Sequence, residues 1–307
     1  MKSKNIGVYL DFDNFWGGLL RDLGIDPKER KQKNYGLLPA EIEIVEELLT
    51  KYLSSFLYSG LEWKFSLWDK AAESRISSYV RYIKAFTVFS KLPFANQIGD
   101  IQNLLHNVGI EPFPSFIAQN TKDASDRALI LEVVEDVFFN QLPIDIVVIG
   151  SGDIDFYPLI SFFYEHSDKS LYILSFDNSL SSLYKEIPLT ASRLINIRGL
   201  LHVLHRRTFG SILEEKKQKL QESIKDSFSN FKRLFLEKLL EAQKEGKEVR
   251  TGLLFSKWLK EWRKQGYDFN SNEINHFLDL MQKEGLIRIE PDREDTPLRG
   301  KIVRLGG

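Results

Sequence analysis

The chain has 307 residues, 43% of them hydrophobic including 22 Phe, and a formal net charge of −1, which together exclude an intrinsically disordered protein. It has no cysteine, which excludes disulfide frameworks, thiolate metal sites and cysteine nucleophiles. No stretch approaches the roughly 20 apolar residues that span a bilayer, so the sequence predicts a soluble, cytoplasmic protein without a membrane partner.

The first 200 residues alternate short apolar runs with amphipathic stretches, the pattern of a parallel α/β domain. We therefore predict an α/β fold class with a doubly wound, mostly parallel sheet and a second, smaller domain. The predicted strands are 6–10, 60–67, 110–113, 144–149, 170–176 and 194–197. The predicted helices are 39–57, 69–88, 101–108, one that opens at residue 123, and one that begins near residue 158.

Carboxylates follow two of the predicted strands, at the point where each strand ends. Asp11, Asp13 and Asn14 follow the first strand, and Asp153 and Asp155 follow the fourth. Ligands of open α/β sheets bind outside the carboxyl ends of the strands, and like charges gathered there need a counter-charge, most simply a divalent cation. The alternative is structural, because an Asp at a strand end can also cap the next turn or helix.

Asp126 is a further candidate carboxylate for this site. If Asp123 caps the following helix, Asp126 occupies its third position, where acidic residues are common. The apolar side chains of Leu129 and Val133 share a helical face with Asp126, which directs its carboxylate towards the top of the sheet. Lys122 lies close by in the sequence, where it would contact a phosphate or balance the acidic cluster.

These motifs together resemble the NYN domain family, a branch of the PIN-like metal-dependent ribonucleases, over about residues 4–197. The most specific element is the string SGD-x-DF-x-PLI at residues 151–160. The resemblance implies a doubly wound α/β domain that cleaves RNA with Mg²⁺ or Mn²⁺. It implies a catalytic and metal-binding set of Asp11, Asp126, Asp153 and Asp155. It also implies substrate contacts from Asn14, Ser151 and Lys122.

The chain departs from the family pattern at two positions. Phe12 stands where the family usually has Gly, and Lys122 stands four residues before Asp126 rather than two or three. Neither change removes a carboxylate. Phosphodiester hydrolysis needs a hydroxide nucleophile and neutralised phosphoryl charge, which carboxylate-bound cations supply without His or Cys.

Two other functions remain open at the level of the sequence. Asp11-Phe-Asp13 also resembles the start of the motif of haloacid-dehalogenase phosphatases, which use a nucleophilic Asp and a second Asp two residues later. The third interpretation is a non-catalytic RNA- or DNA-binding regulatory protein whose acidic domain is a scaffold.

The second part of the chain differs in charge and composition. Residues 1–200 carry 20 Lys and Arg against 26 Asp and Glu, a net charge of −6, whereas residues 201–307 carry 22 against 17, a net charge of +5. An acidic half joined to a basic half fits a metal site tethered to a polyanion-binding module. The predicted domains are 1–204 (nuclease), 205–246 (helical linker) and 247–307 (winged-helix-like).

The winged-helix prediction comes from the order of elements after residue 250. Helices at 252–265 and 270–284 are followed by strands at 286–289 and 301–305, the order of a helix-turn-helix variant with a β-hairpin wing. The second helix would be the recognition helix, with Asn270 or Ser271 as its N-cap.

A basic cluster lies on the first of these helices. Lys257, Lys260 and Arg263 would contact phosphates of RNA, and DNA is the alternative polyanion. Trp258 and Trp262 are four residues apart, so they are equally consistent with core positions beneath a solvated basic face. Winged helices also mediate protein contacts, so a homo-oligomer interface is the other use of this module.

Overall fold

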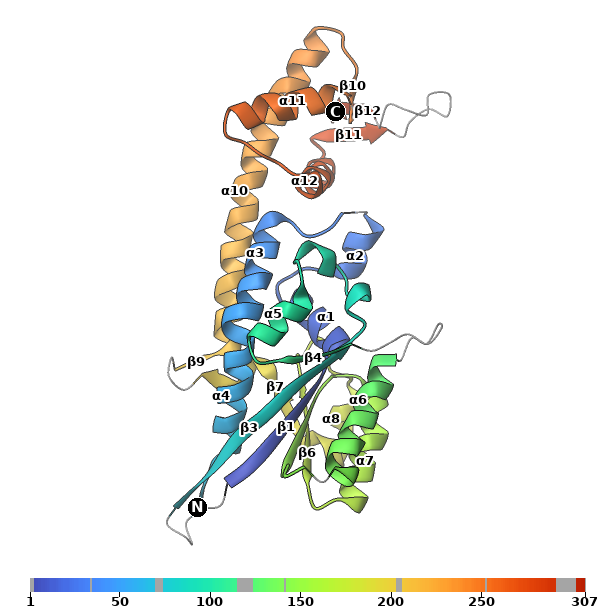
Figure 1. The fold of residues 1–307 in the computed structure, drawn as a ribbon. Coiled ribbons are helices and arrows are strands. Elements are labelled where there is room, and N and C mark those ends of the chain that lie inside the picture. The colour runs from blue at the N-terminus through green and yellow to red at the C-terminus, as the bar shows by residue number, and fades with distance from the viewer. Residues whose placement is uncertain are drawn as a thin grey trace. The chain divides into compact units, whose positions relative to one another are not determined.

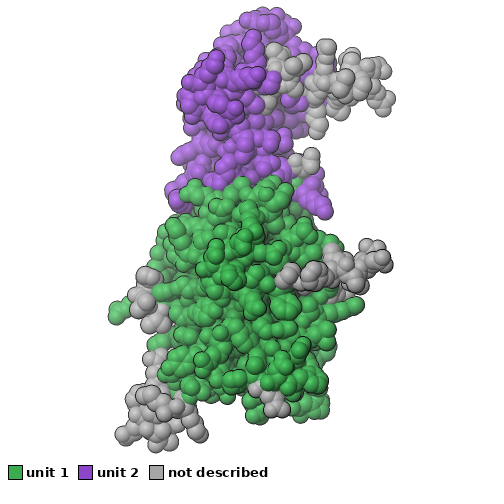
Figure 2. Space-filling view, viewed as in Figure 1, with its two compact units in different colours: residues 1–30, 42–218 green, residues 31–41, 219–307 purple. Residues whose placement is uncertain are grey.

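The computed structural model describes residues 3–33, 35–69, 74–114, 124–140, 142–202, 206–251, 253–290 and 302–306. The chain divides into two compact units (Figure 2): residues 1–30 with 42–218, and residues 31–41 with 219–307. A short N-terminal segment therefore belongs with the C-terminal part of the sequence. None of the helices in the described ranges is long and apolar enough to cross a membrane.

The first unit is built on a seven-stranded sheet with the order β2-β3-β1-β5-β6-β7, and β4 also pairs with β3. Only β2 pairs antiparallel; all the other pairings are parallel. The strands are β1 (Ser3–Asp11), β2 (Leu67–Asp69), β3 (Ser74–Thr87), β4 (Glu111–Pro114), β5 (Ile146–Gly150), β6 (Ser170–Ser175) and β7 (Leu194–Asn196). The predicted α/β fold class with a mostly parallel sheet is confirmed.

The strand order identifies where a ligand would bind. Taken along the chain, the parallel strands are arranged 3-2-1-4-5-6 across the sheet, and this order reverses between β1 and β5. Open α/β sheets bind their ligands outside the carboxyl ends of the strands at such a reversal. The two strands pair in register up to Leu10 and Gly150, so the residues that follow each strand emerge side by side.

Helices cover both faces of the sheet. Helices α6 and α7 lie together on one face, where Leu129 and Val133 share a buried cluster with Ile160 and Phe163 (Figure 1). A π-helical turn, Leu48–Leu53, joins α3 to α4, so the predicted helix 39–57 is present and extends further. The helices are α1 (Phe12–Asp22), α2 (Pro27–Gln32), α3 (Pro39–Glu47), α4 (Ser54–Phe65), α5 (Ile101–Asn107), α6 (Ala124–Val134), α7 (Tyr157–His166), α8 (Leu183–Glu186) and α9 (Pro188–Ala191).

Two predicted elements of this unit were wrong. The predicted strand 60–67 is mostly the last turns of α4, and the predicted helix 69–88 is mostly β3. Buried residues of β3 include Val80, Ile83 and Thr87, a spacing that imitates one face of a helix. The strand is buried on both sides near its end, where Ala85 and Phe86 are fully covered, and such strands lose the alternation that identifies exposed ones.

A polar network is buried between the sheet and α6. The hydroxyls of Tyr9 and Tyr82 donate to Asp136 Oδ2 at 2.9 and 3.0 Å, and Lys84 Nζ lies 2.9 Å from the same oxygen. Lys84 also pairs with Glu132 on α6. Asp136 lies in a π-helical turn, Glu135–Phe139, that extends α6. The network therefore ties α6 to β1 and β3.

The second unit combines the later part of α10 with a small helical and antiparallel module. Its core includes Phe231, Phe235 and Phe277 together with Trp258 and Trp262, so the tryptophans are core residues. Asn270 forms a capping box with Glu273, which confirms one of the two predicted N-caps of α12. The elements are α10 (Phe209–Lys244), β10 (Val249–Arg250), α11 (Leu253–Lys264), α12 (Ser271–Lys283), β11 (Ile287–Glu290) and β12 (Ile302–Leu305), with the sheet order β10-β12-β11.

The segment 31–41 is attached to one face of α12. Three side chains at helical spacing on α12, those of Asn272, His276 and Asp279, each contact this segment. The contacts are Gly36 N to Asn272 Oδ1 at 3.1 Å, Asn272 Nδ2 to Leu37 O at 3.0 Å, Tyr35 Oη to His276 Nδ1 at 3.2 Å and Lys33 Nζ to Asp279 Oδ2 at 2.9 Å. This face of α12 is therefore occupied within its own unit.

Candidate functional site

Asp11 lies at the carboxyl end of β1, where the sheet order reverses. Its side chain is buried, with only 4% of the residue exposed. Ser151 Oγ donates to Asp11 Oδ2 at 2.8 Å, and the backbone N–H of Asn14 donates to Asp11 Oδ1 at 3.2 Å. The second bond makes Asp11 the N-cap of α1. The structural role of a helix cap, which the sequence offered as an alternative, is therefore present, and the functional role stays a prediction.

The environment of Asp11 disfavours its charge. Burial and the negative charges of Asp126 and Asp13 together raise the pKa of Asp11 to about 7, against the lowering effect of the hydrogen bonds from Ser151 and Asn14. The effect of Asp126 on this pKa indicates that the two carboxylates lie near each other. A positive charge close to Asp11 would therefore stabilise its ionised form.

Asp13 belongs to the same site, although sequence reasoning treated it only as a companion of Asp11. Thr87 Oγ1 donates to Asp13 Oδ1 at 2.8 Å, and Ser125 Oγ donates to Asp13 Oδ2 at 3.3 Å. Burial raises the pKa of Asp13, and the charge of Lys91 lowers it. Asp13 thus links the ends of β1 and β3 to the first turn of α6.

The turn after β5 holds Asp11 in place. Ser151 is 1% exposed, and its hydroxyl also accepts from the N–H of Asp153 at 3.1 Å. The N–H of Gly152 donates to Asn14 Oδ1 at 3.1 Å. A Cβ at Gly152 would lie 2.1 Å from the carbonyl oxygen of Ser179, so only glycine fits this turn. Both hydrogen bonds of the Ser151 hydroxyl are internal, so the geometry gives Ser151 a positioning role, and a substrate contact there stays a prediction.

Asp153 and Asp155 are exposed and face a different neighbour. Asp153 Oδ1 accepts the N–H of Asp155 at 3.1 Å, and the hydroxyl of Tyr184 donates to the carbonyl oxygen of Asp153 at 2.5 Å. Burial raises the pKa of Tyr184 above its usual value, and the charges of Asp153 and Asp155 raise it further. The charge of Asp126 thus acts on Asp11, whereas those of Asp153 and Asp155 act on Tyr184, and Ser151 connects the turn of Asp153 to Asp11.

A divalent cation fits the first of these pairs chemically. Among the residues that the structure describes, no three His, Asp or Glu side chains are arranged as a ready-made metal cage. Mg²⁺ often needs none, since it is commonly held by one or two carboxylates together with water and substrate phosphates. Asp11 and Asp126 offer two such oxygen donors, and a cation would favour the charged form of Asp11, which burial disfavours.

The predicted basic contacts are distributed over both units. Lys122 lies outside the described residues. Lys257, Lys260 and Arg263 are exposed on α11, and Arg263 pairs with Asp268 at 2.7 Å. Lys257 and Lys260 make no ion pair with any residue in the described ranges. The cluster is thus a solvated basic face over a tryptophan core.

The comparisons with known proteins bear on the α/β unit. Residues 64–197 match the family model of the NYN domain. The crystal structure of a protein of unknown function from Vibrio parahaemolyticus RIMD 2210633 is 17% identical over 63% of this chain and 93% of that chain, with a TM-score of 0.36, a likeness too weak to support an argument. No curated protein matches the chain. Residues 64–197 of the α/β unit are therefore similar to the NYN domain family, and this match indicates a nuclease-like function related to RNA.

Proposed function

We propose that this protein is a divalent-metal-dependent ribonuclease that hydrolyses phosphodiester bonds at the carboxyl end of β1. One observation carries the proposal: the buried Asp11 lies at the reversal of the strand order, close enough to Asp126 for their charges to interact, in a unit that matches the NYN domain over residues 64–197. Acidic groups with a perturbed pKa are typical of functional sites. This one also lies where open α/β sheets bind their ligands.

The residues take separate roles in this proposal. Asp11 and Asp126 would hold Mg²⁺ or Mn²⁺, and Asp153 and Asp155 would add carboxylates from the turn after β5. The cation would activate water as a nucleophile and neutralise charge on the phosphoryl oxygens. Ser151 and the N–H of Asn14 keep the Asp11 carboxylate in one orientation.

Two side chains would contact the RNA phosphate. Asn14 uses its Oδ1 to hold Gly152, while its Nδ2 makes no hydrogen bond with a described residue and would donate to a phosphate oxygen. Lys91 is exposed and close enough to Asp13 to lower the pKa of that carboxyl, which places a positive charge beside the acidic site.

The decisive test compares RNA cleavage by the wild type and by an Asp126→Asn variant. With labelled single-stranded and structured RNA in Mg²⁺ or Mn²⁺, we expect the wild type to cut and the variant to be reduced to background. The substitution keeps the size of the side chain but removes a negative charge, so binding of the cation is lost while the helix remains. Gel analysis of product formation against time measures the difference.

Two controls separate the proposal from its alternatives. EDTA should abolish wild-type cleavage and excess Mg²⁺ should restore it. Cleavage that persists in EDTA, or in the Asp126→Asn variant, contradicts the metal mechanism. Hydrolysis of p-nitrophenyl phosphate without cleavage of RNA would favour a phosphatase. Binding of RNA without hydrolysis of either substrate would favour a non-catalytic regulator.

The second unit supports a nucleic-acid-binding role as an accessory to this activity. Its order of helix, strand, two helices and two strands, with β10 paired to β12, is that of a winged helix, and we assign it to this class as part of the proposal. The predicted recognition helix α12 has Asn272, His276 and Asp279 engaged by the segment 31–41. The basic face of α11 is therefore the surface we assign to RNA phosphates.

Lys257 and Lys260 provide the test of this surface, because neither is paired with a described residue. In a Lys257→Gln/Lys260→Gln variant we expect weaker RNA binding and a log–log salt dependence that is flatter by about 1.5, since each lost phosphate contact removes roughly 0.7–0.9 of slope. Fluorescence anisotropy at several salt concentrations measures both quantities.

A variant with the same change of charge elsewhere controls for net charge. Lys219 and Lys225 are exposed on α10, and a Lys219→Gln/Lys225→Gln variant should retain the wild-type slope. An equal loss in both variants contradicts a specific face on α11. Unchanged RNA binding with an altered oligomeric state would instead identify the module as a protein-contact element.

A further inference from the structure

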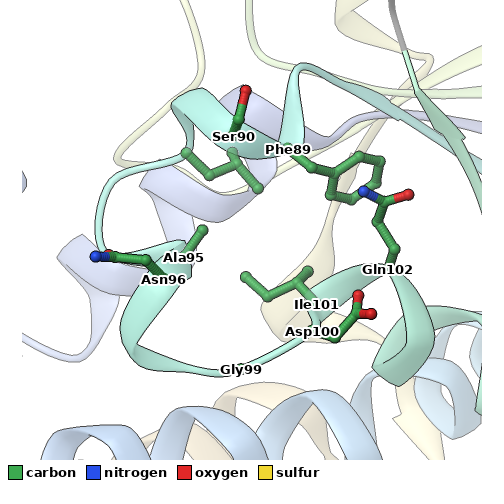
Figure 3. A pocket seen from close by; sticks show the side chains of 9 residues that line it. Phe89, Ser90, Ala95, Asn96, Gly99, Asp100, Ile101 and Gln102 are labelled. Atoms are coloured by element: carbon green, nitrogen blue, oxygen red, sulfur yellow. The ribbon is translucent and has the colours of Figure 1, made fainter.

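A pocket with a volume of about 450 Å³ lies in the first unit, in a loop that contacts α1. It is formed by the loop that follows β3 and by the start of α5. Figure 3 shows that Phe89, Ala95 and Ile101 surround the hollow, with Gln102 beside the ring of Phe89 and Asn96 on the rim. The volume lies within the range of small-ligand sites, and the pocket has mainly apolar walls and opens to solvent.

The pocket is held open by the structure around it. Trp16 Nε1 on α1 donates to the carbonyl oxygen of Pro93 at 3.0 Å, which fixes the loop to the helix that begins at the acidic site. Phe94 has a positive φ of 64°, a conformation that costs about 1–3 kcal/mol for a bulky residue and persists only when the surroundings impose it. Ile98 is 1% exposed and anchors the other end of the loop. The walls are therefore preformed.

The polar groups of the pocket suit an uncharged ligand. Ser90, Asn96 and Gln102 make no side-chain hydrogen bond with the residues that the structure describes, so a hydroxyl and two amides are available at the rim. Asp100 is committed, because its two carboxylate oxygens accept from the N–H and the Nδ2 of Asn103 at 3.2 and 2.6 Å. A phosphate would be repelled by Asp100, whereas a flat ring with amide-like edges fits both the walls and the rim.

The pocket is continuous with the acidic site through a short stretch of chain. Thr87 bonds Asp13 at 2.8 Å, and Phe89 follows two residues later as a wall of the pocket. Phe12, between Asp11 and Asp13, lies with its ring 6.3 Å from that of Phe89. Lys91 supplies a positive charge in the same loop, so a nucleotide can place its phosphate near Lys91 and its base in the pocket.

We propose that this pocket, the base pocket, binds one unpaired nucleobase of the RNA strand whose phosphodiester lies at Asp11 and Asp126. The inference rests on the proposed function and adds its substrate class: single-stranded RNA read at one position next to the cut. Proteins recognise unpaired bases by stacking on aromatic or apolar side chains and by hydrogen bonds to the base edges. Phe89, Asn96 and Gln102 provide these two kinds of contact.

The test combines a pocket-filling variant with RNA that lacks a single base. Ala95 projects towards the hollow (Figure 3), so Ala95→Trp fills the base pocket, while Ala95→Ser leaves it open as the matched control. Each oligonucleotide of a set carries one abasic nucleotide, and its position relative to the cleavage site differs by one nucleotide from one oligonucleotide to the next. Affinity is measured by anisotropy in EDTA, where no cleavage occurs, and KM and kcat are measured in Mg²⁺.

We expect one abasic position to weaken binding to the wild type about 10-fold, the effect of losing one stacked base. Ala95→Trp should bind intact RNA about 10-fold more weakly and should no longer respond to that position, whereas Ala95→Ser should behave as the wild type. Gln102→Ala, which removes only a rim amide on an exposed residue, should change the preferred base at the same position even if Ala95→Trp folds poorly.

The outcomes that overturn the inference differ from those that overturn the proposed function. If RNA is cleaved but every abasic position has the same effect, and neither Ala95→Trp nor Gln102→Ala alters KM or base preference, the base pocket is wrong and the ribonuclease stands. If the wild type neither binds nor cleaves RNA, both are wrong. A loss confined to kcat in Ala95→Trp would show displacement of catalytic residues and would also contradict a base pocket.

Discussion

An Asp11→Asn variant is expected to lose at least about 100-fold in metal-dependent RNA cleavage while becoming more stable without metal at neutral pH. The loss of activity follows from removing a proposed metal ligand. Mutating the residues that merely orient such ligands typically lowers metal affinity or activity 10–100-fold. The gain in stability follows from burial, because the uncharged amide no longer has to carry a negative charge where only 4% of the residue is exposed.

The pH dependence of this gain has a definite sign. The pKa of Asp11 in the folded protein is raised to about 7, above its unfolded value, so the folded state binds more protons than the unfolded state between about pH 4 and pH 7. Wild-type stability should therefore fall as the pH rises through this window, by at most about 4 kcal/mol. Asp11→Asn lacks this decline, so its advantage should be absent near pH 4 and greatest above pH 7.

Thermal unfolding at pH 4, 6 and 8, with and without Mg²⁺, measures both effects. Mg²⁺ should stabilise the wild type more than Asp11→Asn, since only a folded site binds the cation. Asp168→Asn is the matched control, because Asp168 has 86% of its side chain exposed before β6 and should show no change in activity or metal response. A large loss of apo stability in Asp11→Asn would show that its capping of α1 outweighs the cost of its charge.

Much of the α/β fold was predictable, because its short strands end where turn residues and carboxylates begin. β1 and β5 were placed within three residues at each end, and the carboxylates after them identified the edge of the sheet that carries the site. β3 was not predictable from periodicity alone. Both of its faces are buried near its carboxyl end, where Ala85, Phe86 and Thr87 are covered, and this tertiary environment overrides the local pattern.

The candidate site was predictable in part for a similar reason. A strand and a helix each fix which way one side chain points, so Asp11 and Asp126 could be brought together from spacing alone. The turn after β5 has no such regularity, and its hydrogen bonds direct Asp153 towards Asp155 and Tyr184. Thr87 and Lys91 reach the site from the carboxyl end of β3. Because that segment was predicted as a helix, the sequence did not indicate their roles.

A Lys84→Met variant is expected to be destabilised by about 3–5 kcal/mol at pH 8, the usual result of removing one partner from a buried ion pair. Lys84 and Asp136 have 12% and 5% of their side chains exposed. Burial alone would lower the pKa of Lys84, but its bonds to Glu132 and Asp136 raise it, so the ammonium is fully charged between pH 4 and pH 8.

Without that ammonium, Asp136 would be left as a buried carboxylate beside Tyr9 and Tyr82. Such a buried carboxylate is costly only while it is charged. The destabilisation should therefore be small near pH 4 and increase as the pH rises, which urea unfolding at the two pH values measures. A loss that is equal at both pH values would indicate lost packing rather than an uncompensated charge.

The double variant Lys84→Met/Asp136→Leu separates the charge from the geometry. Replacing both members of a buried ion pair by apolar residues is often nearly neutral, so most of the lost stability should return. RNA cleavage need not return with it. Asp136 and Asp126 belong to one continuous helical segment, and the polar network fixes the end of that segment against β1 and β3. Recovered stability with impaired cleavage would mean that the network positions Asp126 opposite Asp11.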